Sequence, residues 1–211
     1  MRAALVVRAR KLDLDAWTEI TVVDAKAAEG GASTSLLQGL TFRNIDLLHA
    51  MLLVSDNRVP TALARSVGMS PKQLLAEMNS LAKKLGLEHT HFDDVTGITG
   101  NKSTAREMAI AMKSVLADPV LARIMHTRYA RITSEDGEKT IDYKSTVKPL
   151  WDKLYKVRAG KTGTTDDAGH CMLITVEIDG KPYTMAFIGG ESANSRFLDF
   201  AKLAHHVDSL Q

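Results

Sequence analysis

The sequence predicts an α+β protein in which helices and antiparallel strands occupy separate stretches of the chain. Two observations support this fold class. Apolar residues recur at helical spacing through the middle of the chain, and from Tyr129 onward the period changes to strands and hairpin signals. We expect one domain over residues 1–211, with a mostly helical lobe at 34–127 and a sheet-containing lobe formed by 1–33 and 128–211.

The composition is that of an ordinary globular protein. Of 211 residues, 45% are hydrophobic and 25% are charged, which excludes a disordered or collagen-like chain. The net charge of +2 gives no bulk electrostatic case for a nucleic-acid partner. No apolar run approaches the roughly 20 residues that span a bilayer. The single cysteine, Cys171, cannot form an internal disulfide.

The amino-terminal segment predicts a helix from about Arg2 to Lys11, followed by a strand at Glu19–Val23. It does not read as a signal peptide, because Arg8 and Arg10 interrupt a short apolar stretch. No Ser, Thr, Asp or Asn precedes the helix as a cap. We therefore expect the domain to be truncated at its amino end.

Four signals predict the helices of the middle region. An apolar stripe begins at Phe42 and ends near Ser55. Ser70 and Pro71 open a helix that Gly86 stops. Ser103 or Thr104 caps a further helix, and Asp118-Pro119 starts the next one.

The carboxy-terminal third predicts strands and one closing helix. Two short strands, 130–133 and 140–143, flank a turn signal. Three stronger strands follow at 155–163, 169–178 and 181–189. Phe197, Phe200, Ala201 and Ala204 make an amphipathic helix that covers the sheet. A helical lobe against a sheet edge predicts a cleft.

Two tripeptides stand at the ends of suitable elements. Ser55-Asp56-Asn57 follows the apolar helix, and Lys161-Thr162-Gly163 closes the strand that begins at Tyr155. Lys161 shares strand parity with Tyr155, Val157 and Ala159, so we expect it on the more apolar face. A half-buried cation needs an anionic partner or ligand. Thr162 adds a hydroxyl donor, and Gly163 lets another backbone approach closely.

In this order the two tripeptides match the second and third motifs of serine enzymes that bind penicillin. The flanking sequence agrees: His91-Phe92 before Thr96-Gly97, then Ser103-Thr104-Ala105-Arg106, and Lys161 to Thr165 running into Ala168-Gly169-His170-Cys171. Over nearly its whole length the chain resembles the low-molecular-mass penicillin-binding proteins, the D-alanyl-D-alanine carboxypeptidases and endopeptidases. The resemblance implies the penicillin-binding (β-lactamase/transpeptidase-like) fold, incomplete at the amino end.

The resemblance also implies a role for each motif residue. Ser55 relays protons and orients the catalytic lysine, and the Asn57 amide holds the substrate backbone. Lys161 belongs to the catalytic set, Thr162 helps to hold the substrate carboxylate, and Gly163 belongs to the substrate-binding set. The backbone N–H of Thr164 serves as an oxyanion donor. Asp56 is expected to point away.

The same resemblance sets the wider expectations. The implied partners are peptidoglycan peptides and β-lactams, with no nucleic acid, and the implied compartment is the periplasm. The reaction proceeds through an acyl-serine with no metal or organic cofactor. Membrane association is left open.

The first motif of that family, Ser-x-x-Lys, is not found before Ser55. Laid on the family pattern, its serine and lysine fall just before Met1. Two other matches, Ser80 with Lys83 and Ser145 with Lys148, follow Ser55, and about one such match is expected by chance. The sequence therefore predicts the carboxy-terminal portion of a longer protein, whose strand at Lys181–Gly189 becomes an exposed apolar edge.

Four functions stay open from sequence. They are an active carboxypeptidase or endopeptidase with its nucleophile elsewhere, an inactive peptidoglycan or β-lactam binding remnant, a β-lactamase, and a non-enzymatic assembly module. For a β-lactamase no deacylating glutamate is evident, although Glu77 and Glu107 are candidates.

Other residues favour structural roles. His89 and His91 lack a third ligand for a metal. His170 and Cys171 are strand neighbours, so they face opposite sides and do not share a proton. Lys153, Lys156, Arg158 and Lys161 form a basic run suited to anionic peptide stems, although a solvated strand face explains the first three equally well.

Overall fold

The computed structural model describes residues 1–32 and 34–210, and the chain forms two compact units. The first unit consists of Met1–Ser103 and Tyr129–Lys144, and the second of Thr104–Arg128 and the chain from Ser145 onward. These boundaries differ from a division at residues 34 and 127, because the amino-terminal helix packs on helices of the first unit. That residues 1–211 are one domain stays a prediction.

The first unit is mostly helical. Its helices are α1 (Arg2–Ala9), α2 (Val22–Ala27), α3 (Asn44–Leu53), α4 (Val59–Ser66) and α5 (Pro71–Lys84). Helix α1 packs against α4 and α5, and α4 against α3. The fully buried side chains of α3 and α4 include Leu47, Leu48, Leu52 and Leu63, which together form the core of this unit.

Two short antiparallel sheets complete the first unit. Strand β1 (Trp17–Glu19) pairs with β2 (Thr41–Arg43), and β3 (Tyr129–Thr133) pairs with β4 (Thr140–Lys144). The second pair is the hairpin that the turn signal predicts. Its turn is joined to β2, since the backbone N–H of Glu135 donates to the carbonyl oxygen of Thr41 at 2.9 Å.

The expected strand at Glu19–Val23 is wrong. Strand β1 ends at Glu19, and Val22 begins α2, because Thr21 and Asp24 form a reciprocal capping box at that point. Val22 and Val23 are 61% and 60% exposed, so their apolar character does not report a strand face. Cap chemistry outweighs β-propensity here.

Phe42 is the second correction. It lies in β2, opposite Thr18, and the helix begins two residues later at Asn44. Phe42 is fully buried, so its spacing from the helical stripe reflects a shared core and not a shared helix. The same helix ends at Leu53, and helix α4, which has Pro60 in its first turn, was not predicted from sequence.

The cap signals predict the remaining helices well. Ser70 accepts from the backbone N–H of Gln73 at 3.2 Å, and Gln73 accepts from the N–H of Ser70 at 2.8 Å. Thr104, one of the two candidates, caps α6 (Ala105–Leu116). Asp118 caps α7 (Pro119–His126) through two backbone N–H groups.

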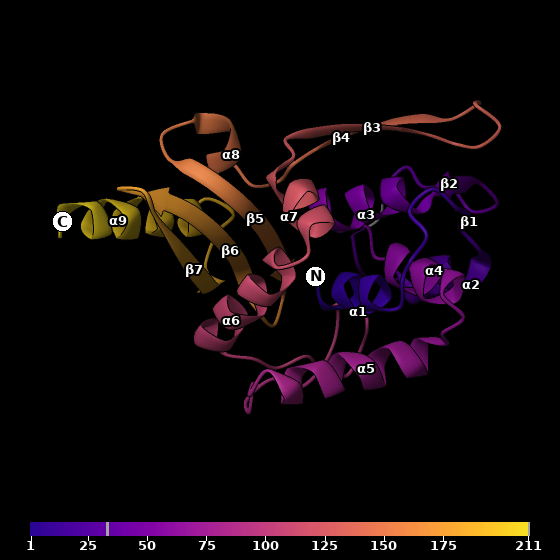
Figure 1. The fold of residues 1–211 in the computed structure, drawn as a ribbon, viewed down its shortest axis with the longest axis horizontal. Helices are drawn as coiled ribbons and strands as arrows, with labels where there is room; N and C mark the ends of the chain where they lie inside the picture. Colours follow the sequence, from indigo (N-terminus) through magenta and orange to yellow (C-terminus); the bar gives the residue numbers. More distant parts are fainter. Residues whose placement is uncertain (33, 211) are drawn as a thin grey trace. The chain divides into compact units, whose positions relative to one another are not determined.

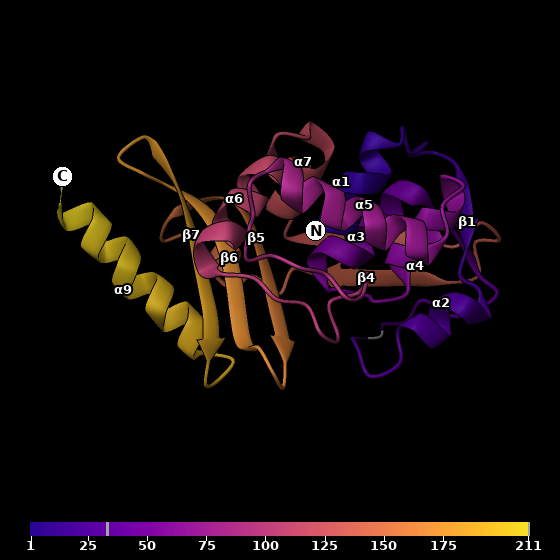
Figure 2. The same cartoon turned by 90° about the horizontal axis from the view of Figure 1, so that it is seen from below.

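The second unit is built on a three-stranded antiparallel sheet in the order β5-β6-β7. Its strands are β5 (Lys156–Thr165), β6 (Gly169–Ile178) and β7 (Lys181–Gly190), close to the predicted spans. Helix α9 (Ser195–Ser209) covers one face of the sheet, and α6 lies on the other face (Figure 1, Figure 2). Strand β7 is an outer strand of this sheet, as expected.

The core of the second unit lies under α9 and the short helix α8 (Pro149–Asp152). Phe200, from α9, is 3% exposed and contacts Tyr155 edge-on, with ring centroids 5.5 Å apart. It meets Phe187 in the same way at 6.4 Å. The sheet contributes the buried side chains Met172, Ile174, Val176 and Met185.

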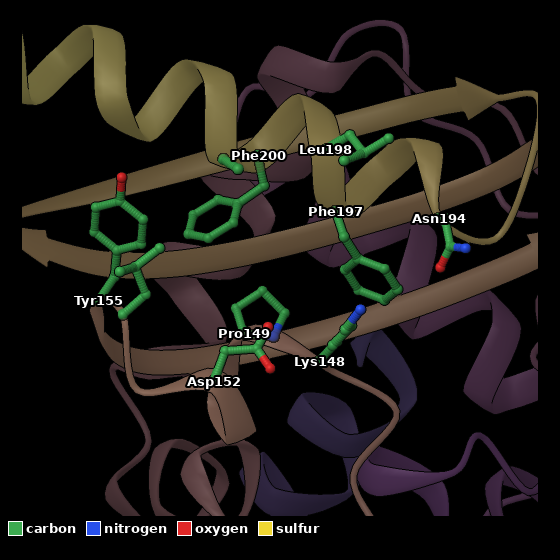
Figure 3. Close-up of a pocket in the computed structure, with 10 residues that line it drawn as sticks. Lys148, Pro149, Asp152, Tyr155, Asn194, Phe197, Leu198 and Phe200 are labelled. Carbon is green, nitrogen blue, oxygen red and sulfur yellow. The ribbon is translucent and has the colours of Figure 1, made fainter.

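A largely apolar cavity of about 350 Å³ lies between α8, the start of β5 and α9. Figure 3 shows Phe197 and Phe200 facing Pro149 and Tyr155 across it, with Lys148 and Asn194 beside Phe197. None of the motif residues lines it.

No helix among residues 1–32 and 34–210 combines the length and the apolar character needed to cross a membrane.

Replacing Phe200 by alanine is expected to lower the free energy of unfolding by about 3 to 5 kcal/mol, because it removes a fully packed aromatic ring. Leu198→Ala in the same helix is the control: Leu198 is 61% exposed, and its removal is expected to cost about 0.5 kcal/mol or less. Chemical denaturation followed by circular dichroism measures both. Equal losses in the two variants would contradict this account of the core.

Candidate functional site

The first predicted motif forms a tight turn directly after α3. Ser55 has a φ of 64°, in the left-handed region that residues with a side chain rarely adopt. The backbone N–H of Asp56 then donates back to the carbonyl oxygen of Ala50 in α3 at 3.1 Å. The helix end and this backward bond place Ser55 and Asn57 on one turn, as the sequence predicts.

The Asn57 side chain is clasped by two backbone segments. Its Oδ1 accepts from the N–H of Ala32 at 3.1 Å, and its Nδ2 donates to the carbonyl oxygen of Thr96 at 3.3 Å. The N–H of Asn57 also donates to the carbonyl oxygen of Ala32 at 3.0 Å. Because Asn57 is 8% exposed, these bonds fix the orientation of its amide.

Sequence reasoning missed the two supports of that amide. Gly31 leaves no room for a side chain, since a Cβ there would lie 2.8 Å from Cγ of Asn57 and 2.6 Å from Cδ1 of Ile98. Asp94 organises the loop that carries Thr96, accepting from the N–H groups of Gly97 and Thr99 at 2.8 Å each. Burial alone would raise the pKa of Asp94, but these hydrogen bonds and those from Thr96 lower it below its ordinary value. The Gly30-Gly31 pair was the available signal.

The Asp56 side chain points into the interior of the first unit. It is 1% exposed and forms an ion pair with Arg58, with 2.8 Å between Oδ2 and Nη2. It also accepts from the hydroxyl of Thr34 at 2.6 Å. Tyr143 in turn bonds the Thr34 hydroxyl at 2.9 Å, and burial raises the pKa of Tyr143 to about 12.

The second predicted motif lies near the end of β5. Lys161 is half-buried, and its Nζ donates to the carbonyl oxygen of Thr162 at 2.8 Å. Thr162 is 7% exposed, and its hydroxyl bonds that of Thr146 at 2.5 Å. Gly163 is exposed, and nothing within 4 Å would meet a side chain there.

The parity argument for Lys161 needs a correction. A β-bulge lies between Val157 and Ala159, so Lys161 shares a face with Ala159 but not with Val157. Its cross-strand partner is Leu173, which is 7% exposed. The face is apolar, as expected, although Val157 and Tyr155 were wrongly assigned to it, since both pack in the core under α9. Bulges leave no clear sequence signal here.

Arg196 is a second cation beside this motif, and sequence reasoning missed it. Its Nη1 donates to the carbonyl oxygens of Gly163 and Cys171 at 3.1 and 3.2 Å, and to the hydroxyl of Thr164 at 3.2 Å. Burial lowers the pKa of Arg196. A signal was present, because Arg196 stands in the first turn of α9, where the helix dipole disfavours a cation.

The surroundings of Lys161 disfavour its charged form. Desolvation by burial, followed by repulsion from Arg196, lowers its pKa from 10.5 to about 8. A carboxylate brought to this end of β5 would offset both effects. With hydroxyls at Thr162 and Thr164, the arrangement suits the recognition of an anionic group such as a peptide carboxylate.

The remaining candidates keep structural roles. Ser80 and Lys83 lie exposed on α5, and Ser145 lies in the connection before α8, where its hydroxyl accepts from the N–H of Val147 at 3.3 Å. His170 and Cys171 have separate partners: the His170 ring bonds the hydroxyl of Thr164 at 3.1 Å, and the Cys171 thiol donates to the carbonyl oxygen of Ala168 at 3.2 Å.

His91 pairs with the Asp93 carboxylate at 3.1 Å. Among the residues that the structure describes, no three His, Cys, Asp or Glu side chains gather as a metal site.

Comparison with known proteins identifies the class. The family described as D-alanyl-D-alanine carboxypeptidase matches residues 1–192. The chain belongs to this family. Its fold is that of the penicillin-binding DD-peptidases: the structure of a DD-transpeptidase from Streptomyces superposes with a TM-score of 0.89 at 24% identity, covering 100% of this chain and 85% of that chain.

Curated relatives carry related names. The D-alanyl-D-alanine endopeptidase of Escherichia coli is 26% identical over 210 residues, which cover 99% of this chain and 67% of that protein. A D-alanyl-D-alanine carboxypeptidase of Bacillus subtilis is 29% identical over 194 residues, covering 83% of this chain and 46% of that protein. This chain is thus similar to about two thirds of the first protein and about half of the second.

Replacing Arg196 by methionine is expected to raise the pKa of Lys161 from about 8 toward 10.5, because it removes the second of the two causes of the shift. An NMR titration of the Lys161 Cε signal measures the change. The control is Arg158→Met, in the same strand as Lys161. The Arg158 side chain is exposed and pairs with Glu177, so its loss should leave the Lys161 titration unchanged.

The lowered pKa of Lys161 should also make the free energy of unfolding depend on pH. The folded form binds fewer protons than the unfolded form between pH 8 and 10.5, so the free energy of unfolding rises with pH across that window. The rise should be smaller in Arg196→Met. A Lys161 pKa that is unaltered by the Arg196 substitution would contradict the proposed coupling.

Proposed function

We propose that the protein acts as a serine-type D-Ala-D-Ala carboxypeptidase or endopeptidase on peptidoglycan stem peptides, and that its 211 residues supply the binding and proton-relay part of the site. The observation that carries the proposal is the pair of built motifs. One is the turn in which the Asn57 amide is clasped at Ala32 and Thr96. The other is the strand end at which Lys161 and Arg196 place two cations.

Each residue has a part in this proposal. Lys161 and Arg196 attract the free carboxylate of a terminal D-alanine, and the Thr162 hydroxyl contributes a donor. The Asn57 amide, whose Nδ2 keeps a second N–H beyond its bond to Thr96, holds the peptide backbone. Ser55 relays a proton, and the Thr164 N–H stabilises the developing oxyanion.

The attacking serine is proposed to lie outside these residues. No Ser-x-x-Lys sequence occurs before Ser55. Of the two later matches, Ser80 lies on the exposed surface of α5, and Ser145 lies in the connection before α8. The alternative proposal is a remnant that binds peptidoglycan or β-lactams without chemistry. A native product several kilodaltons heavier than this chain would favour the first, and a native product of this mass would favour the second.

The compartment follows from the substrate. Peptidoglycan lies outside the inner membrane, so the proposed place of action is the periplasm. Covalent chemistry in this family proceeds through serine, and the proposal includes no metal or organic cofactor.

The 211-residue chain is expected to bind a synthetic peptide ending in D-Ala-D-Ala reversibly, and to form no covalent adduct with fluorescent penicillin. Lys161→Met should weaken peptide binding at least about tenfold, since it removes a charge that meets the carboxylate. Lys156→Met is the matched control, because Lys156 lies on the same strand but is exposed and pairs with Glu177. Isothermal titration calorimetry measures the affinities.

Three outcomes separate the possibilities. A covalent penicillin adduct would show that a nucleophile is present in this chain. Equal affinity for the peptide and its carboxy-terminal amide would contradict the role of Lys161. Failure of the folded chain to bind either the peptide or penicillin would contradict the binding role itself.

A further inference from the structure

We propose that Asp56 is a positioning residue: its buried carboxylate, paired with Arg58, anchors the chain at Thr34 and Leu36 and thereby fixes the turn that carries Ser55 and Asn57. The inference rests on the proposed function only for its consequence on peptide binding. Its structural part concerns the first unit alone.

The turn at Ser55 has an unusual backbone conformation. Ser55 occupies the left-handed region of the backbone, which residues with a side chain adopt only when surrounding contacts hold them there. Asp56 follows immediately, and Asn57 follows Asp56. Whatever fixes Asp56 therefore constrains both neighbours.

The Asp56 carboxylate accepts five hydrogen bonds from protein donors. Its Oδ1 accepts from the backbone N–H and from Nε of Arg58, both at 3.0 Å. Its Oδ2 accepts from the N–H of Thr34 at 3.0 Å, from the Thr34 hydroxyl at 2.6 Å and from Nη2 of Arg58 at 2.8 Å. With 1% of Asp56 exposed, these protein donors take the place of water.

Arg58 also binds the backbone at Thr34 and Leu36. Its Nη2 donates to the carbonyl oxygen of Thr34 at 2.6 Å, and its Nη1 donates to that of Leu36. Because the Thr34 hydroxyl gives its proton to Asp56, Tyr143 is the donor in the bond between Tyr143 and Thr34. The network thus joins three separate stretches of chain.

Thr34, which donates to Asp56, is close in sequence to Ala32, which donates to the Asn57 amide. Ala32 lies two residues before Thr34 and makes two bonds with Asn57, one to its backbone and one to its side chain. Loss of the anchor at Thr34 is therefore expected to weaken the hydrogen bonds between Ala32 and Asn57, while the core of α3 stays packed.

The test compares Asp56→Asn with Asp24→Asn. The asparagine at 56 keeps the shape of the side chain but turns one acceptor into a donor that faces the donors of Thr34 and Arg58. Asp24 is an equally buried carboxylate in the same unit, with partners Thr21, Thr61 and Arg65. Its substitution controls for a general loss of stability.

The first readout needs no ligand. In Asp56→Asn, amide hydrogen exchange at Ala32 and Asn57 is expected to speed up at least about tenfold relative to exchange at Leu52 in the α3 core. In Asp24→Asn the ratio should stay as in the wild type. An unchanged ratio in Asp56→Asn would overturn the inference.

The second readout is the affinity for a synthetic peptide ending in D-Ala-D-Ala, which should fall about tenfold in Asp56→Asn and stay unchanged in Asp24→Asn. Equal affinities in both variants would overturn the consequence for binding. A wild-type chain that binds no peptide would count against the proposed function, whereas the exchange ratio would still decide the role of Asp56.

If Asp56→Asn fails to fold, Thr34→Val replaces it. This variant removes the hydroxyl bonds to Asp56 and Tyr143 but keeps the ion pair with Arg58. Exchange at Ala32 relative to Leu52 is expected to rise about threefold or more. No rise would overturn the inference.

Discussion

The buried ion pair of Asp56 and Arg58 is the interaction on which the Ser55–Asn57 turn depends. A buried charge is costly unless a partner and hydrogen bonds satisfy it, and breaking such a pair by removing one member costs about 3 to 5 kcal/mol. Here both carboxylate oxygens are occupied, and the guanidinium continues to two carbonyl oxygens. Asp56, the residue after the left-handed Ser55, is therefore anchored inside the first unit.

The second unit presents the complementary physical situation. Lys161 and Arg196 bring like charges to one end of β5 at the expense of desolvation, which lowers the pKa of both groups. A carboxylate near these two cations would offset both causes of the Lys161 shift.

Local chemistry explains which parts of the fold could be predicted. The caps at Ser70, Thr104 and Asp118 and the hairpin signals act over a few residues, so the sequence shows them directly. Apolar periodicity does not distinguish an exposed helical valine from a strand residue, which is why the prediction failed at Val22 and Val23. It also does not distinguish a buried strand residue from a helical one, which is why the prediction failed at Phe42. The bulge after Val157 shifts a face by one residue, and such a shift depends on the pairing with β6.

The sequence by itself determined the fold class, the two motifs and the family, since these rest on residue identity and short-range order. Only the tertiary structure decided how the motifs are supported. Gly31, Ala32 and Thr96 lie 25 or more positions from Asn57 and reach it through backbone hydrogen bonds and close packing, which side-chain types do not encode. Arg196 reaches Gly163 from 33 positions away for the same reason: a helix folded over the sheet brings it there.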